Sequence, residues 1–182
     1  LRKQGVKVGV LNVSMFRPFP ADLITKILAG AKGVTVLART DQPLAVDQPL
    51  VREIRAAMTQ GLENWKALHA SGNGAKKGAA LPYPKVTAID PASMPDFYSA
   101  GFGFGSRDLQ PGDIVAAVNN MLPGGKHKRQ YYLGIDFIRK GTKLPKLQIW
   151  QEQLLEAYPD LADLTLQPVG NLDLMPEGTV SL

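Results

Sequence analysis

One short polar stretch has residue types that could bind an anion. The letters "ARTDQP" follow the apolar run "VTVL", and they contain Arg39, Thr40 and Asp41. The arginine and the threonine could hold an anion while the aspartate orients the guanidinium, and open α/β sheets bind ligands at the carboxyl ends of their strands. An ordinary polar turn has the same composition, however, so both interpretations stay open.

A second arginine, Arg17, stands in "RPFP" after another apolar run, residues 6–13. It would reach the same edge of a parallel sheet as Arg39 if both runs are strands. The alternative is a loop arginine that packs across the rings of Phe16 and Phe19. Neither arginine is a catalyst by itself.

The glycine-rich stretch "GFGFGS" is the third candidate for ligand binding. Its Gly103, Gly105 and Ser106 could bring backbone N–H groups close to a phosphate. The spacing is not that of a dinucleotide-binding fingerprint, and no Walker lysine and serine follow. We therefore favour a tight connection between a strand and a helix over a phosphate site.

The sequence predicts no catalytic residue and no metal site. It contains no cysteine, which excludes thiolate ligands, cysteine nucleophiles and disulfides, and its two histidines have no metal-ligand spacing. There is no Gly-x-Ser-x-Gly elbow. The aspartates 90, 96, 108 and 113 stand at predicted turns or helix starts, where capping accounts for them.

The elements that must position these residues alternate between strands and helices. Apolar, β-branched runs predict strands at residues 6–13, 34–39, 97–100 and 131–137, with a further short strand at 85–89. Helical spacing of apolar residues predicts helices at 18–33, 47–70, 111–122 and 146–158. Asp47 is the expected N-cap of the second helix, and Gly61 is a possible interruption. This order indicates a three-layer α/β/α sandwich with a mainly parallel sheet.

The predicted organisation is one α/β domain over residues 1–145, with an insertion at about 70–95, and a helix and linker at 146–182. "LRKQG" has the composition of a helix end, and "TVSL" resembles the first residues of a strand. We therefore expect an internal domain of a larger protein.

The chain is basic and predicted to be cytoplasmic. It carries 21 basic and 16 acidic residues in 182, with 45% apolar content, and no apolar run is long enough to span a membrane. The densest basic stretches are "GGKHKRQ" and "IRKGTK", which we interpret as solvated turns since no nucleic-acid motif accompanies them. Two alternatives stay open: a binding module for a phosphorylated ligand such as CoA, and a nucleic-acid binder.

Several blocks in a fixed order carry a resemblance to a known family. "VGVLNVSMFRPFP", "AGAKGVTVLARTDQPLAVDQPLVREIRAAM", "SAGFGFGSRDLQPGDIVAAVNNM", "YYLGIDF" and "GTKLP" resemble the transketolase-C-terminal-like domain II of pyruvate:ferredoxin (flavodoxin) oxidoreductases. The matching positions include the candidate cofactor-binding or inter-domain residues Arg17, Arg39, Thr40, Gly103, Gly105 and Ser106. Ala38 departs from the pattern, because the family usually has an aspartate there, and Phe104 stands where leucine is usual.

The resemblance implies a non-catalytic domain that lacks its first strand and helix and belongs to a larger 2-oxoacid oxidoreductase. That enzyme would use thiamine diphosphate, magnesium and iron–sulfur clusters held by other domains. It would take CoA as co-substrate, form an acyl-CoA and pass electrons to ferredoxin or flavodoxin. The expected partners are the other domains or subunits of a dimeric parent enzyme, with no nucleic acid and no membrane.

Overall fold

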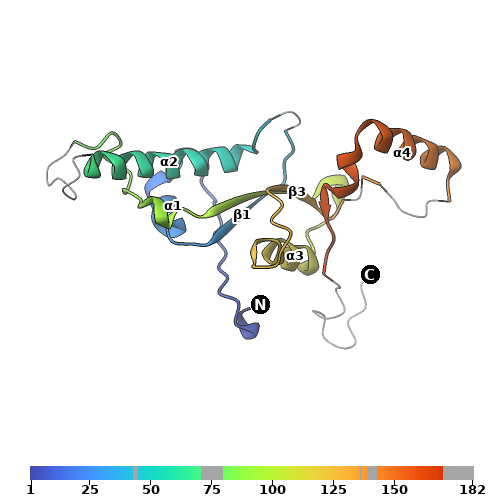
Figure 1. The fold of residues 1–182 in the computed structure, drawn as a ribbon, viewed down its shortest axis with the longest axis horizontal. Helices are drawn as coiled ribbons and strands as arrows, with labels where there is room; N and C mark the ends of the chain where they lie inside the picture. The colour runs from blue at the N-terminus through green and yellow to red at the C-terminus, as the bar shows by residue number, and fades with distance from the viewer. Residues whose placement is uncertain (43–44, 71–79, 136, 139–142, 170–182) are drawn as a thin grey trace. The chain divides into compact units, whose positions relative to one another are not determined.

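The structure is a computed structural model that describes residues 1–42, 45–70, 80–135, 137–138 and 143–169 (Figure 1). The chain forms two compact units, which are described separately. The first comprises Leu1–Val36 and Gln42–Phe97, and the second comprises Leu37–Asp41 and Tyr98–Leu182.

Two helices build the first unit. Helix α1 (Ala21–Leu28) and helix α2 (Pro49–His69) pack against each other (Figure 1). Both helices have one apolar face. Pro49 stands in the first turn of α2, where its missing N–H costs no hydrogen bond. The core of this unit consists of Ile24, Leu28, Val36, Val51, Ile54, Met58, Ile89 and Phe97.

Helix α2 is fastened to the following loop through two of its residues. The Nδ2 atom of Asn64 donates to the carbonyls of Tyr83 (2.8 Å) and Val86 (2.7 Å), and its Oδ1 atom accepts from the Tyr83 N–H (3.0 Å). The carbonyl of Gly61 accepts from the Ile89 N–H (3.0 Å). These bonds satisfy a fully buried amide and hold the loop on the helix.

The sheet has four strands in the order β1-β2-β3-β4. They are β1 (Gly33–Ala38), β2 (Asp96–Gly101), β3 (Gln130–Leu133) and β4 (Thr165–Leu166). The pairs β2–β3 and β3–β4 are parallel; Ser99 lies opposite Gln130, and Tyr132 opposite Thr165. The fold is therefore α/β with a mainly parallel sheet, which confirms the predicted fold class.

The second unit adds two α-helices to its strands. Helix α3 (Pro111–Met121) follows the glycine-rich turn, and helix α4 (Pro145–Ala157) leads into β4. The core consists of Tyr98, Ala100, Ala116, Ala117, Tyr131, Leu133 and Leu166. Short 3-10 helices lie at Arg2–Gln4, Pro91–Ser93, Phe104–Ser106 and Pro159–Asp163.

The prediction of strands at residues 6–13 and 85–89 is wrong. Both segments lie outside the strands, and Val10 is 96% exposed rather than buried. A strand needs a hydrogen-bonded neighbour as well as suitable residues. The second of these segments instead directs its Thr87 N–H and hydroxyl to Asp22, at 2.9 and 2.6 Å.

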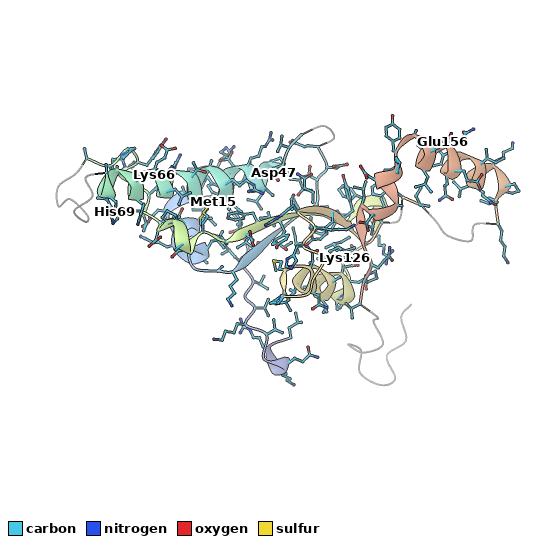
Figure 2. The ribbon with its side chains drawn as sticks, in the orientation of Figure 1. Met15, Asp47, Lys66, His69, Lys126 and Glu156 are labelled. Atoms are coloured by element: carbon cyan, nitrogen blue, oxygen red, sulfur yellow. The ribbon has the colours of Figure 1, made fainter. Side chains whose placement is uncertain are left out.

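Three smaller differences concern element ends. Strand β3 stops at Leu133 because Gly134 has a φ of 72°, so the predicted extension to residue 137 is not formed. Strand β4 was not predicted, because two residues carry too little periodicity to detect. Gln48, not Asp47, precedes the first turn of α2; Asp47, at the start of the helix in Figure 2, pairs with Arg55 at 2.7 Å.

Parts of several predictions fall outside the described residues. These are residues 71–79 of the predicted insertion, residues 139–142 of the basic stretch "IRKGTK" and the tail at 170–182 with its expected strand. The division into residues 1–145 and 146–182 stays a prediction.

Replacing Gly61 with alanine tests the attachment of α2. A Cβ atom there would lie 2.7 Å from two Ile89 side-chain carbons and 2.9 Å from the Thr87 carbonyl oxygen. Alanine has the higher helix propensity, but overpacking outweighs it, and we expect a net loss of about 1–2 kcal/mol in the free energy of unfolding. Urea denaturation measures this loss. The control Thr59→Ala, at an exposed position of α2, should change stability by less than about 0.5 kcal/mol. A stabilised Gly61→Ala variant would contradict the packing described here.

Asp22 should make the stability of the first unit depend on pH. Hydrogen bonds from Lys26 and then Thr87 hold the pKa of this carboxyl below its ordinary value of 3.8, so folding favours the charged form. The contribution of the Asp22 carboxylate to the free energy of unfolding is present above the unfolded-state pKa. It is lost as the pH falls through the lower, folded-state pKa. Melting temperatures of the wild type and Asp22→Asn should therefore differ most at neutral pH and converge in acid. A difference that is constant across pH would show that the carboxylate charge is not responsible.

Candidate functional site

The carboxyl ends of β1 and β2 are tied together in the second unit. The carbonyl of Ala38, the last residue of β1, accepts a hydrogen bond from the Phe102 N–H at 3.2 Å. Arg39, Thr40 and Asp41 follow Ala38 directly. The structure therefore places this predicted anion-binding stretch beside the glycine-rich turn, which is the arrangement expected at the carboxyl edge of a parallel sheet.

Arg39 and Gly103 lie in direct contact. A Cβ atom at Gly103 would be 2.8 Å from Nε of Arg39 and 3.0 Å from its Cγ, so only glycine leaves room for the arginine stem. Gly103, Gly105 and Ser106 all have positive φ, at 75°, 63° and 61°. A serine in this region is uncommon and carries backbone strain. The turn thus places one of the predicted residues, Gly103, directly against Arg39.

Asp41 is engaged by an aromatic residue from β3 that the sequence analysis did not select. The Tyr132 hydroxyl donates to Oδ1 of Asp41 at 3.0 Å, across 91 positions in sequence. Burial, and then the Asp41 carboxylate, raise the pKa of the Tyr132 phenol above its ordinary value. The ring packs edge-on against Phe104 at 5.8 Å and Phe137 at 5.1 Å. Asp41 therefore accepts from a tyrosine, and no ion pair between it and Arg39 is present.

The start of α3 adds a buried carboxylate to this unit. Asp113 is fully buried, and its Oδ2 atom accepts from the Gln110 N–H at 2.9 Å, which confirms a capping role. Its Oδ1 atom has no hydrogen-bond partner among the described residues.

Arg107 is exposed, and its Cδ and Nε atoms lie 3.5 Å from the position that a Cβ would take at Gly134.

Arg17 belongs to the first unit, and its guanidinium is engaged there. It pairs with Glu53 at 2.8 Å and lies over the Phe16 ring, 4.3 Å from the centroid. These contacts correspond to the structural alternative for this residue. The other predicted residues lie in the second unit; they are Arg39, Thr40, Gly103, Gly105 and Ser106. Ligand binding by any of them stays a prediction.

The two histidines make local contacts. His69, in the last turn of α2 with Lys66 (Figure 2), stacks on Trp65 at 4.2 Å, and His127 hydrogen-bonds the Tyr98 hydroxyl at 3.2 Å. Within the described ranges, no group of three or more histidine or acidic side chains could hold a metal ion. No helix in this part of the chain is both long and apolar enough to cross a membrane.

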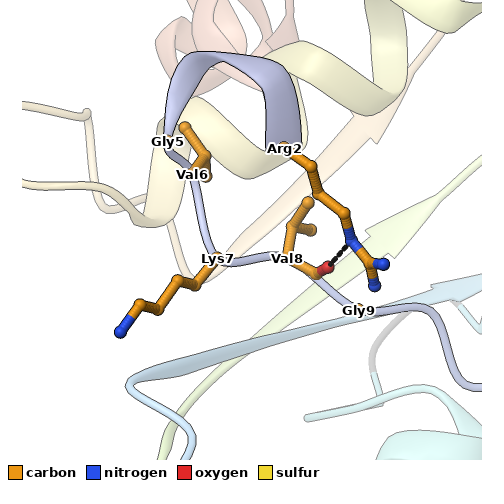
Figure 3. Close-up of a pocket in the computed structure, with 6 residues that line it drawn as sticks. All are labelled: Arg2, Gly5, Val6, Lys7, Val8 and Gly9. Carbon is orange, nitrogen blue, oxygen red and sulfur yellow. Dashed lines mark hydrogen bonds between the residues drawn. The ribbon is translucent and has the colours of Figure 1, made fainter.

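A hollow of about 510 Å³ lies at the N-terminal segment (Figure 3). Its lining comes from residues 2–9 alone, where Nε of Arg2 donates to the Val8 carbonyl at 2.8 Å. A bend within one segment forms it, and it contains no acid and no nucleophile. We therefore do not regard it as a reaction site.

Together these features define a class of protein: an α/β domain with arginines and a strained glycine turn at one sheet edge. No described residue there forms a nucleophile–base pair. The acids of this edge, Asp41 and Asp113, accept hydrogen bonds from groups of their own unit. Such an edge can bind or contact an anionic group.

Comparison with known proteins supports the resemblance to this family. Residues 1–76 match the family model described as pyruvate:ferredoxin oxidoreductase core domain II. The chain is 29% identical over 160 residues to the probable pyruvate-flavodoxin oxidoreductase of Escherichia coli (strain K12), covering 86% of this chain and 12% of that protein. It is 28% identical over 136 residues to pyruvate synthase subunit PorA of Thermotoga maritima, covering 74% of this chain and 27% of the subunit.

A third relative extends the same pattern. The pyruvate-flavodoxin oxidoreductase of Nostoc sp. (strain PCC 7120) is 26% identical over 137 residues, which are 75% of this chain and 10% of that protein. These matches confirm the resemblance: residues 1–76 carry the core domain II sequence of pyruvate:ferredoxin oxidoreductases, and most of the chain is similar to pyruvate-flavodoxin oxidoreductases and to a pyruvate synthase subunit. The chain spans only about a tenth of the two pyruvate-flavodoxin oxidoreductases and about a quarter of the subunit.

Two glycines of the turn provide a matched test of the Arg39 contact. Alanine at Gly103 or Gly105 should cost about 1–2 kcal/mol, because both positions have positive φ. Only Gly103→Ala also collides with Arg39, since nothing lies within 4 Å of a Cβ at Gly105. We expect Gly103→Ala to be the less stable variant by about 1 kcal/mol in chemical denaturation. Adding Arg39→Ala should remove that difference, and equal stability of the two glycine variants would refute the contact.

Proposed function

We propose that the chain is an internal, non-catalytic structural domain of a 2-oxoacid:ferredoxin/flavodoxin oxidoreductase of the pyruvate type. The observation that carries the proposal is the match of residues 1–76 to core domain II, extended by relatives that cover three quarters or more of the chain. The parent enzyme would decarboxylate a 2-oxoacid oxidatively with thiamine diphosphate and form an acyl-CoA.

The geometry of the sheet edge supports a structural rather than a catalytic role. The Ala38 carbonyl, the Asp41 carboxylate and the Asp113 carboxylate all accept hydrogen bonds from the same unit. Polar groups used in this way fix the course of three connections. The domain would contribute by orienting its neighbours, since a displacement of about an ångström at a reacting group can cost a hundredfold in rate.

The donor set of the chain indicates where the parent's cofactors would be held. A sequence without cysteine cannot supply thiolates for iron–sulfur clusters, so the proposal assigns the clusters to other parts of a cytoplasmic, dimeric parent enzyme. It assigns thiamine diphosphate and magnesium there as well, because the family resemblance implies it. Ferredoxin or flavodoxin would accept the electrons there.

A second candidate function follows from the exposed arginines. Arg39 lies against the glycine-rich turn, and Arg107 ends that turn before α3. Arg39 follows β1 and Arg107 follows β2, and guanidinium groups on two such neighbouring connections are suited to a phosphate, so the unit could bind a phosphorylated ligand such as CoA.

The deciding experiment is anaerobic viologen reduction by the full-length parent enzyme, with pyruvate and 2-oxoglutarate compared and CoA varied. We expect CoA-dependent activity with pyruvate as the better substrate. Arg39→Ala should leave kcat and the KM for CoA within about twofold, because Arg39 would not touch the reacting groups.

Other outcomes separate the two candidates. A rise of about tenfold or more in the KM for CoA, at unchanged kcat, would favour the binding module. CoA binding to the 182-residue chain, measured by calorimetry and lost in Arg39→Ala, would favour it independently. Absence of activity with either 2-oxoacid, in a parent loaded with thiamine diphosphate and clusters, would refute the proposed substrate class.

A further inference from the structure

The N-terminal segment has the residues of a strand but none of its hydrogen bonds. Residues 6–13 read "VKVGVLNV", a composition typical of strands. In the described part of the chain, no backbone–backbone hydrogen bond involves residues 7–16. Two side chains donate hydrogen bonds to carbonyls of this stretch: Arg2 to that of Val8 (Figure 3), and Arg17 to that of Phe16. The segment thus presents a row of unpaired peptide groups.

The same segment exposes large apolar side chains. Val10 is 96% and Leu11 40% exposed, while Val13 packs against the core of the first unit. Directly after the segment, Met15 is 55% and Phe16 41% exposed. Helix α1 of the same unit adds Leu23 and Ile27, which are 56% and 48% exposed. Apolar side chains gathered along one stretch, together with an unpaired backbone, are the signature of a surface that is covered by a partner.

We propose that residues 6–13 are a docking strand that pairs with a β-strand of the parent polypeptide outside these 182 residues. The inference rests on the proposed function, because it takes its partner from the same larger enzyme. The segment lies inside the match to a core domain, so it belongs to a folded part of that enzyme and is not a tail. The relatives offer ample chain for a partner strand, since this sequence covers only 10–12% of the pyruvate-flavodoxin enzymes.

Charge indicates what the partner strand looks like. The first twenty residues contain Arg2, Lys3, Lys7 and Arg17 and no acidic residue. Pairing two copies of this segment would bring like charges together, which destabilises cross-strand pairs. The partner is therefore a different strand, with apolar residues opposite Val10 and an acidic side chain within reach of Lys7.

Hydrogen exchange followed by mass spectrometry tests this docking in the full-length parent and in the 182-residue chain. Amides 7–16 should exchange at least about 100-fold more slowly in the parent, because pairing protects them. In the parent, Val10→Asp should speed exchange of these amides by about tenfold or more. Ile114→Asp, which places the same charge at an exposed apolar position of α3, should leave them unchanged.

The outcomes separate this inference from the proposed function. Equal, fast exchange of amides 7–16 in both proteins would overturn the docking, even if the parent oxidises pyruvate. Protection that develops in the 182-residue chain as its concentration rises would mean pairing of two copies and would also overturn it. Protection in a parent that oxidises no 2-oxoacid would support the docking and refute only the proposed function. If the Val10→Asp variant of the parent does not fold, the exchange rates of amides 7–16 in the wild-type parent and in the 182-residue chain still decide whether the segment is docked.

Discussion

The burial of β2 is the constraint on which both compact units depend. Every residue from Phe97 to Gly101 is buried. Phe97 contributes to the core of the first unit, while Tyr98 and Ala100 contribute to the core of the second. One strand of six residues therefore completes two hydrophobic clusters. A polar side chain introduced here would be buried without a partner, and its desolvation would weaken the affected core.

Packing at the end of β2 also positions residues of the candidate site. A Cβ at Gly101 would lie 2.9 Å from the Phe104 ring and 3.1 Å from the Tyr132 ring, so the strand must end in glycine for these rings to pack. The Tyr132 ring position in turn directs its hydroxyl to Asp41. The connections after β1 and β2 are thus held by packing in the sheet, and Arg39 rests on a turn whose course is already fixed.

Sequence periodicity predicted those elements whose partners lie within the described chain. Strands β1 and β2 and helices α1, α2 and α3 were predicted at nearly their observed positions, because each buries apolar residues. Helix α4 was predicted too, although Gln151 is its one buried residue. Residues 6–13 have the same composition as β1, yet they remain unpaired, since composition does not specify a hydrogen-bonding neighbour. Gly61 looked like an interruption of α2 and is instead a close contact with Ile89 that only the tertiary structure reveals.

The candidate site was predictable to a similar extent. Arg39, Thr40 and the glycine-rich turn were selected because they follow two strands, and parallel strands bring their carboxyl ends together. The prediction that Asp113 caps a helix start was correct. The bond between Tyr132 and Asp41 spans 91 positions, and no local pattern signals it. Arg17 was grouped with Arg39 because it follows the run at residues 6–13, but that run is not a strand and Arg17 pairs with Glu53.

The charge balance at the sheet edge follows from this arrangement. The family resemblance leads one to expect an aspartate before Arg39, but this chain has Ala38, whose carbonyl ties β1 to the glycine-rich turn. The nearby acids are engaged elsewhere, Asp41 by a phenol and Asp113 by a backbone N–H. Neither acid forms an ion pair with Arg39 or Arg107 among the described residues, and both arginines are exposed. An edge that engages its acids internally and exposes its cations is suited to an acidic surface or an anion. Such an edge attracts a partner by its field, while the packed sheet fixes how that partner is oriented.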